Sequence, residues 1–416
     1  MRKLTRYLLW AFVFTVPWDT VQLPLVGSVS RAFGLAVVGA AVLTTAIEGR
    51  FRKPDAVLGF AITFIVWVAL SLLWTSSYEN TVVLVTTYVQ LVASVWVIRE
   101  LVRTGEQEQA LLVALCFGLF VPLMDLLNNF RVGAGIRPDV SRFTGFGLNA
   151  DAAGLYLVLG LPIAWQLLMF CRRRMIRGVS LIYVVIAPVG LLLTGTRGAF
   201  LAGLIALAIV PLTLRQSLRS YALAGVLLVL GAVFAALLVP GSNWERILST
   251  ATEITGGGTM SGRMDIWKAG LQAFPQRPLA GAGAGAYSAA VEPYLDNHFG
   301  NNAHNMAFGL LIEEGLVGLS LFAGILGACA WTIFRSPPPH RALFGVLMLT
   351  WLVGGMSGDP RRDKLTWVLF GLVSAQSGLR RTVSDVSPTE QTSRRGEERF
   401  ACLHEDRRAA TAVQSA

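Results

Sequence analysis

The composition of the chain excludes most classes of soluble protein. The sequence has 416 residues, of which 54% are hydrophobic and 14% charged, and its mean hydropathy is +0.58. Soluble proteins carry about 25% charged residues, and disordered chains are poor in apolar residues. The net charge of +10 would indicate nucleic acid in a soluble chain, but no nucleic-acid partner is expected for a chain this apolar. The class that remains is a polytopic membrane protein.

Apolar segments long enough to cross a membrane recur along most of the chain. A spanning helix needs about 20 mostly apolar residues, so the pattern predicts an all-α fold with about 12 transmembrane helices. The predicted spans are about 7–26, 31–47, 56–74, 80–98, 109–127, 151–170, 178–194, 198–214, 220–240, 304–334, 342–358 and 364–379. The segment 304–334 is too long for one crossing, and it is expected to begin with an interfacial piece that turns at Gly315.

The spans divide the chain into four regions. Residues 1–240 hold transmembrane helices one to nine, and residues 304–379 hold helices ten to twelve. Between them, residues 241–303 form one large loop. The tail, 380–416, mixes Ser, Thr, Arg and Glu without an apolar period, which predicts disorder.

Lysine and arginine in the short loops predict the orientation, because positive charge favours the cytoplasmic side. Both termini are then cytoplasmic, and the loop 241–303 lies on the outer face. The inner turns and the start of the tail would hold Arg50, Arg52, Lys53, Arg99, Arg103, Arg172, Arg173, Arg174, Arg177, Arg215, Arg219, Arg335, Arg341, Arg380 and Arg381.

Basic residues also lie on the predicted outer face, where membrane insertion does not call for them. They are Arg131, Arg137 and Arg142 in the loop 128–150, Arg197 in a tight turn, and Arg361, Arg362 and Lys364 between the last two spans. An anionic ligand on this side is the simplest reason for them. The alternative is ordinary contact between snorkelling side chains and lipid headgroups.

The first motif is the segment 193–198, Leu-Thr-Gly-Thr-Arg-Gly, which joins two apolar runs almost without a loop. Arg197 therefore begins a helix at the membrane boundary, where a cation opposes the helix dipole and approaches hydrocarbon at a cost. A guanidinium grips phosphate through two parallel hydrogen bonds. We interpret Arg197 as an anion-binding residue, with a structural ion pair to another span as the alternative.

Two further motifs lie in the large loop. In the segment 256–267, a glycine stretch leads into a predicted helix that carries Arg263 in its first turn and Trp267 facing the membrane or a sugar. A solvated arginine on a surface helix is the alternative interpretation of Arg263. The segment 278–287 superficially fits a dinucleotide-binding fingerprint, but it follows no strand of a βαβ unit, so a tight turn of small residues is expected there.

The last motif is Asn-Asn-Ala-His-Asn at 301–305, where the large loop re-enters the membrane. Neutral imidazole can take a proton from a hydroxyl at neutral pH, so His304 is a candidate base. A capping histidine bonded to asparagines is the alternative. The outer face shows no HExxH motif and no aspartate-rich motif, so we expect a site that needs neither metal nor cofactor.

The order of these motifs resembles that of the O-antigen ligase and O-antigen polymerase superfamily. The resemblance runs from Thr-Gly-Thr-Arg-Gly at 194–198 through Gly-Arg-x-x-Ile-Trp at 262–267, the glycine run from Pro278 and His304-Asn305, to Glu-Gly-Leu-Val-Gly at 314–318. It covers about residues 140–320 by motif and the whole chain by topology.

The resemblance implies an inverting membrane glycosyltransferase of GT-C-type architecture, with its active site on the periplasmic face of a bacterial inner membrane. The family's donor is a glycan on undecaprenyl diphosphate. In that picture Arg197 and Arg263 bind the diphosphate leaving group, and His304 activates the acceptor hydroxyl. Arg142 would be an additional phosphate contact, and Trp267 and Asn305 are further candidates for substrate binding.

Within the superfamily, the single dominant outer loop favours the ligase, which transfers O-antigen to lipid A–core. The polymerase, which joins repeat units on the lipid carrier, is the alternative. A hypothesis of another class is a flippase or other transporter of lipid-linked oligosaccharides. A transporter is expected to bury charges in the middle of its spans, whereas the polar groups here gather on one face.

Overall fold

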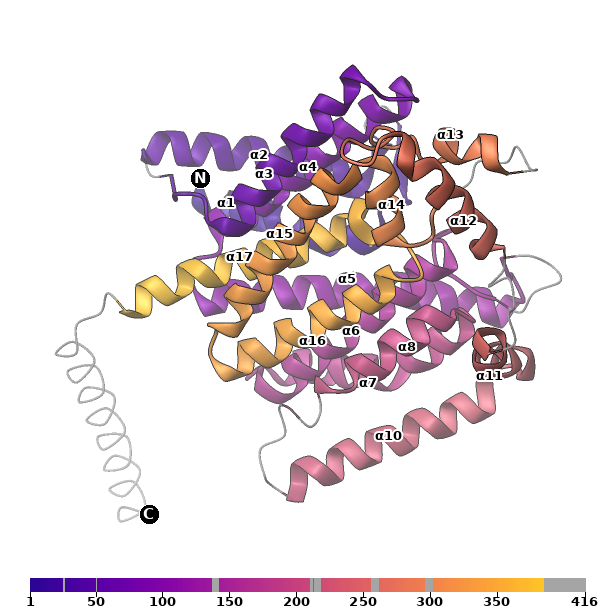
Figure 1. The fold of residues 1–416 in the computed structure, drawn as a ribbon. Helices are drawn as coiled ribbons and strands as arrows, with labels where there is room; N and C mark the ends of the chain where they lie inside the picture. The colour runs from indigo at the N-terminus through magenta and orange to yellow at the C-terminus, as the bar shows by residue number, and fades with distance from the viewer. Residues whose placement is uncertain are drawn as a thin grey trace, which may run out of the picture.

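The computed structural model describes residues 1–24, 27–49, 51–136, 142–209, 212, 218–255, 262–295 and 302–384. Its long helices lie side by side in one bundle (Figure 1). The helices are α1 (Arg2–Thr15), α2 (Val29–Glu48), α3 (Ala56–Leu70), α4 (Tyr78–Leu101), α5 (Gly105–Val132), α6 (Ala150–Phe170), α7 (Arg174–Leu193), α8 (Arg197–Ala206), α10 (Leu218–Leu238), α11 (Gly241–Thr255), α12 (Arg263–Ala273), α13 (Tyr287–Val291), α14 (Met306–Glu313), α15 (Gly315–Phe334), α16 (Pro338–Gly355) and α17 (Lys364–Ser384).

Short elements connect several of these helices. The strands β1 (Gln22–Leu23) and β2 (Gly27–Ser28) pair antiparallel between α1 and α2. The 3-10 turns are η1 (Val16–Trp18), η2 (Ser71–Leu73), η3 (Phe274–Gln276), η4 (Glu292–Tyr294) and η5 (Pro360–Arg362). Within the described ranges the fold is therefore all-α apart from one hairpin of two-residue strands.

Seven helices of the described chain are long and apolar enough to span a membrane, and α10 with α11 adds an eighth if this pair, bent by 112°, counts as one span. The chain is thus a multi-pass membrane protein, while the predicted number of twelve spans and the GT-C fold stay predictions. Among these candidate spans α6 is the most buried, since 83% of its apolar segment lies inside the protein. It packs against α5, α7, α8 and α16 and forms the centre of the bundle.

Several element boundaries differ from the sequence prediction, and the helix at the start of the span predicted over 198–214 ends at Ala206. The first span, predicted over 7–26, is a helix only to Thr15, because a 3-10 turn that begins at Val16 and contains Pro17 leads into the hairpin. The described parts of 241–303 are mostly short helices rather than open loop. The last helix continues to Ser384, and the predicted disorder of the tail concerns residues that, beyond 384, lie outside the described chain.

The predicted turn at Gly315 is present. α14 ends at Glu313, and α15 begins at Gly315, whose φ of +68° is the left-handed conformation that glycine adopts without strain. This break turns the chain from a short helix at the end of the bundle into a spanning helix. In Figure 1, α11, α12, α13 and α14 gather on the right, at one end of the bundle.

The glycine run after Pro278 packs against this break. The amide of Ala282 donates to the carbonyl of Ile312 (2.9 Å), and the amide of Gly283 donates to that of Glu313 (2.9 Å). A Cβ on Gly281 would lie 2.3 Å from the Glu313 carbonyl oxygen, and the φ of Gly281 is +71°. The run is therefore a close backbone packing site.

We expect Gly281→Ala to lower the free energy of unfolding by about 1–3 kcal/mol, because the new Cβ meets backbone at a strained positive φ. Gly39→Ala is the matched control, since a Cβ at Gly39 in α2 would meet nothing within 4 Å. Thermal unfolding in detergent, followed by circular dichroism, measures both. Equal melting temperatures for the two variants would contradict this account.

Candidate active site

Three arginines surround the turn between α7 and α8. Gly195 has a φ of +59°, and the turn that it allows leaves two backbone carbonyls as acceptors. Arg142 Nε donates to the Thr194 carbonyl (2.9 Å), and Arg246 Nε, from α11, donates to that of Gly195 (3.1 Å). The turn thus fixes one edge of each of these two guanidinium groups.

Arg197 is the first residue of α8, as the sequence predicts. Its Nε donates to the Arg246 carbonyl (2.9 Å), and its Nη2 donates to the hydroxyl of Ser249 (3.0 Å). These contacts join the start of α8 to α11, the helix that lies across the end of the bundle. Arg142, Arg197 and Arg246 therefore form one basic cluster around Gly195.

Arg263 lies in the first turn of α12 and points at the ends of two long helices. Its Nη1 donates to the Ser357 carbonyl just beyond α16 (2.9 Å), and its Nη2 pairs with Asp151 Oδ2 in the first turn of α6 (2.9 Å). About a quarter of each charged side chain is exposed. Arg263 is thus paired and largely buried, which the alternative of a solvated arginine on a surface helix does not describe.

His304 and Asn305 reach the same place from α14. Asn305 caps this helix by accepting from the amides of Ala307 and Phe308, and its Nδ2 donates to the Met356 carbonyl (3.0 Å). Met356 immediately precedes Ser357, the residue that Arg263 contacts. Two neighbouring carbonyls at the end of α16 therefore hold Arg263 and the residue next to His304.

The basic cluster around Gly195 adjoins this second group of residues. Gly198 lies one residue after Arg197, and a Cβ there would lie 1.7 Å from the hydroxyl of Ser357. Ser357 thus separates the start of α8 from Arg263, and only glycine at 198 permits so close an approach. Residues predicted from three distant motifs therefore meet just beyond the end of α16.

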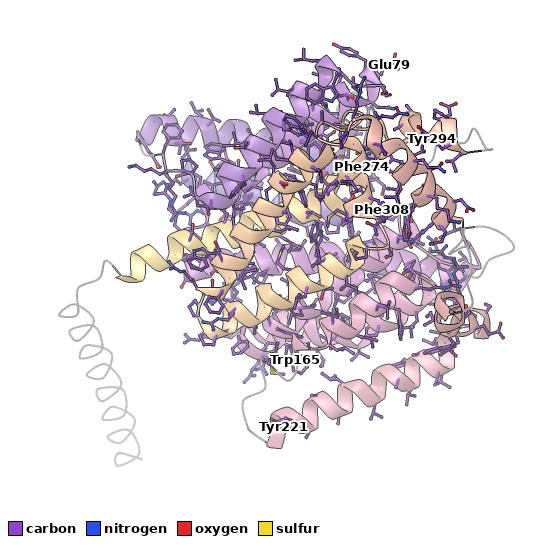
Figure 2. The ribbon with its side chains drawn as sticks, in the orientation of Figure 1. Glu79, Trp165, Tyr221, Phe274, Tyr294 and Phe308 are labelled. Carbon is purple, nitrogen blue, oxygen red and sulfur yellow. The ribbon has the colours of Figure 1, made fainter. Side chains whose placement is uncertain are left out.

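Trp267 supports this site from within α12. Its Nε1 donates to the carbonyl of Ala303 (2.7 Å), and its ring stacks on Phe308 at 5.2 Å with an interplanar angle of 8°. Figure 2 labels Phe308 at this end of the bundle, together with Phe274 and Tyr294. One face of the Trp267 ring is thus covered by protein, and the side chain holds the segment that leads into His304.

His304 lies in an environment that favours the neutral imidazole. The residue is half-buried and has a φ of +46°, which is uncommon outside glycine. Burial and the positive charge of Arg263 lower its pKa, and the carboxylates of Asp151 and Asp359 offset part of this effect. At neutral pH the ring can therefore accept a proton.

The cations between the last two spans are not open to a ligand in the way that the sequence suggests. Arg361 is fully buried, with Nε on Asp359 (2.8 Å), Nη1 on Glu314 (2.6 Å) and Nη2 on Glu313. Arg362 also pairs with Glu313. Burial alone would raise the pKa of Glu313, but the two arginines lower it below its usual range.

Lys364 is neutralised in the same manner. Its Nζ lies 2.5 Å from Asp19 Oδ1 and 2.8 Å from the hydroxyl of Ser30. Asp19, and the acids Glu313 and Glu314 at the junction of α14 and α15, are far in sequence from the cations that they bind. An outer basic residue is therefore no guide to an anion site until its partners are known.

Sequence reasoning missed several residues of the site. Asp151 and Asp359 look like scattered acids in the sequence, and Arg246 lies in a segment that was predicted as loop. Asp151 follows Asn149, whose side chain accepts from the Asp151 amide at the start of α6, and this capping pattern is the one signal that could have placed it at the end of the bundle.

Within the described ranges, no group of three or more His, Cys, Asp or Glu side chains is arranged to hold a metal ion. Arginines supply the positive charge at this end of the bundle. That the reaction needs no metal stays a prediction.

The protein is thus an all-α, multi-pass membrane protein with a cluster of arginines and a histidine at one end of its helix bundle. Residues 181–323 match the model of the family described as O-antigen ligase, and this match supports membership of the O-antigen ligase superfamily. The matched segment includes Arg197, Arg263 and His304. No curated protein matches the chain. The family points to a membrane glycosyltransferase-like enzyme that acts on lipid-linked glycans.

The electrostatic environment of His304 predicts opposite effects of two substitutions. Arg263→Gln removes a cation that lowers the pKa of His304, so the pKa should rise; Asp151→Asn removes an anion that raises it, so the pKa should fall. An NMR pH titration of ¹³C-histidine-labelled protein measures both, with His304→Gln to assign the signal. His340, which pairs with Glu108 elsewhere, is the internal control. Shifts of the same sign in the two variants would refute this arrangement.

Proposed function

We propose that the protein is an O-antigen ligase that transfers O-antigen polysaccharide from undecaprenyl diphosphate to a hydroxyl of lipid A–core, with inversion and without a metal. The observation that carries this proposal is the convergence on the end of α16: Arg263 contacts Ser357, Asn305 contacts Met356, and the helix that starts with Arg197 packs against Ser357. Cations and a neutral base in one partly buried place are what glycosyl transfer from a diphosphate requires.

In the proposed reaction, the acceptor oxygen forms a bond to the anomeric carbon while the bond from that carbon to the diphosphate oxygen breaks. Arg197 and Arg263 neutralise the charge that develops on the departing undecaprenyl diphosphate, and Arg142 is an additional contact. Preorganised donors stabilise such charge best where water is largely excluded. His304 takes the proton of the acceptor hydroxyl.

Trp267 and Asn305 complete the site. Both were predicted as substrate contacts, and the partners of their side chains favour a positioning role. Asn305 is buried, caps α14 and bonds to Met356, while Trp267 binds the carbonyl of Ala303. These two contacts flank His304 on either side in the sequence. We infer that they fix the position of the imidazole.

The proposal places the enzyme in the bacterial inner membrane, with both termini cytoplasmic and the site on the periplasmic face, where lipid-linked donor and lipid A–core acceptor meet. The alternative function is an O-antigen or exopolysaccharide polymerase that joins lipid-linked repeat units, for which the same arginines and histidine would serve. A flippase is less well supported, because the site gathers at one end of the bundle rather than along a central path.

We expect Arg197→Ala and Arg263→Ala each to lower transfer by about 10²–10³-fold, the usual loss when one donor to a developing anion is removed. Lysine at either position should restore only part of the activity, since an ammonium group cannot form the bidentate hydrogen bonds of a guanidinium. Arg131→Ala is the control, because this arginine is exposed at the end of α5 and, within the described part of the chain, its guanidinium hydrogen-bonds only to Asn128. Transfer measured with purified protein and lipid-linked donor tests the set; full activity of either alanine variant would remove that arginine from the proposed site.

The experiment that separates ligase from polymerase is a lipopolysaccharide gel of a deletion strain, with lipid-linked glycan assayed in parallel. Loss of all O-antigen from lipid A–core with long glycan accumulating on the carrier is the result expected for a ligase. A core that bears one repeat unit would instead indicate a polymerase.

Complementation of the same strain with His304→Ala should reproduce the deletion pattern while donor binding persists, because the imidazole is assigned to the acceptor. An unchanged ladder in the deletion strain would contradict both functions and direct attention to another acceptor.

A further inference from the structure

A groove of about 170 Å³ lies among α1, α2 and α4, with Lys364 of α17 at one end. Its walls are almost entirely apolar, and the main contributors are Phe12, Leu35, Val37, Val38, Val89 and Leu91. The hollow exists because two wall residues are small: Ala93, and Gly34, where a Cβ would come within 3.2 Å of the Phe12 ring.

The groove is formed largely by helices that are expected to cross the membrane. α2 and α4 are both candidate spans, and the rim residues Leu35 and Val89 are about half exposed, at 52% and 51%. Along α2 the lining runs from Ser30 to Val38, which is about 12 Å at 1.5 Å per residue. This length is close to half of a hydrocarbon core of about 30 Å, so the groove fits part of one lipid chain.

One end of the groove is basic. Lys364 and Ser30 are already bound to Asp19, but Arg31 is exposed, and within the described part of the chain its guanidinium makes no hydrogen bond or ion pair. Arg31 lies in the first turn of α2, where a cation opposes the helix dipole. A bound anion there would gain from both the guanidinium and the helix end.

We propose that this groove binds one anionic glycerophospholipid, with a hydrocarbon chain against the apolar walls and the headgroup phosphate on Arg31. A zwitterionic lipid such as phosphatidylcholine would fill the groove equally well, but the choline cation beside its phosphate weakens the attraction to Arg31. The site is separate from the candidate active site, which is built on α6, α8, α12, α14 and the end of α16. The proposal therefore does not depend on the proposed enzymatic function.

Native mass spectrometry of the full chain, released from detergent micelles that contain equal amounts of phosphatidylglycerol and phosphatidylcholine with the same acyl chains, tests the proposal. We expect the wild type to retain one phosphatidylglycerol with about fivefold preference, the effect of about one favourable cation–headgroup contact. Arg31→Gln should reduce this preference to about one. Ala93→Leu should reduce the retention of both lipids, because it fills the hollow and leaves Arg31 in place.

Arg174→Gln is the matched control, since Arg174 is also an exposed arginine in the first turn of a spanning helix, α7. Elution volume and melting temperature show that each variant is folded. The proposal is overturned if Arg31→Gln keeps the preference, if Arg174→Gln loses it equally, or if Ala93→Leu retains as much lipid as the wild type. Displacement of phosphatidylglycerol by an equimolar polyprenyl phosphate would also overturn it, because the groove would then belong to the carrier lipid.

Discussion

The buried guanidinium of Arg361 is the contact on which the arrangement of the site depends. It binds acids from two directions: Glu313 and Glu314 at the junction of α14 and α15, and Asp359 in its own loop. A buried arginine is tolerated only when its charge and its donors are satisfied, so the short helix α14 and the α16–α17 loop are locked together. Removing one partner of such a pair typically costs about 3–5 kcal/mol.

This lock determines where the candidate catalytic residues can lie. α14 is preceded by His304, is capped by Asn305 and ends at Glu313, and the loop that Arg361 holds also contains Met356 and Ser357 just beyond α16. Because one rigid unit presents both the histidine and the carbonyls that hold Arg263, the relative position of base and cation does not rest on long flexible loops. Sites need such support from packed elements to keep their geometry.

The cost of burying an unpaired charge also explains why basic residues on the predicted outer face do not by themselves mark an anion site. In water an arginine on the predicted outer face would be free to bind an anion, but at low dielectric a charge has to find a partner within the fold. Arg361 and Lys364 do so with acids that are remote in sequence. Arg142, Arg197 and Arg263 differ from Arg361 in that they are only partly buried and use backbone carbonyls as well as polar side chains.

The amino-acid sequence alone predicts the class of protein, most of the spanning helices, the helix start at Arg197, the turn at Gly315 and the resemblance to the O-antigen ligase family. These features depend on local composition and on neighbouring residues: apolar length, the conformational freedom of glycine and the order of short motifs. The sequence does not predict that Arg263 pairs with Asp151 or that Asn305 binds Met356. It also does not predict that Arg361 forms buried ion pairs with Glu313 and Glu314. These contacts are visible only in the tertiary structure, because each joins residues that are 47 to 112 positions apart in the sequence. Helix packing and the need to pair buried charges bring these residues together.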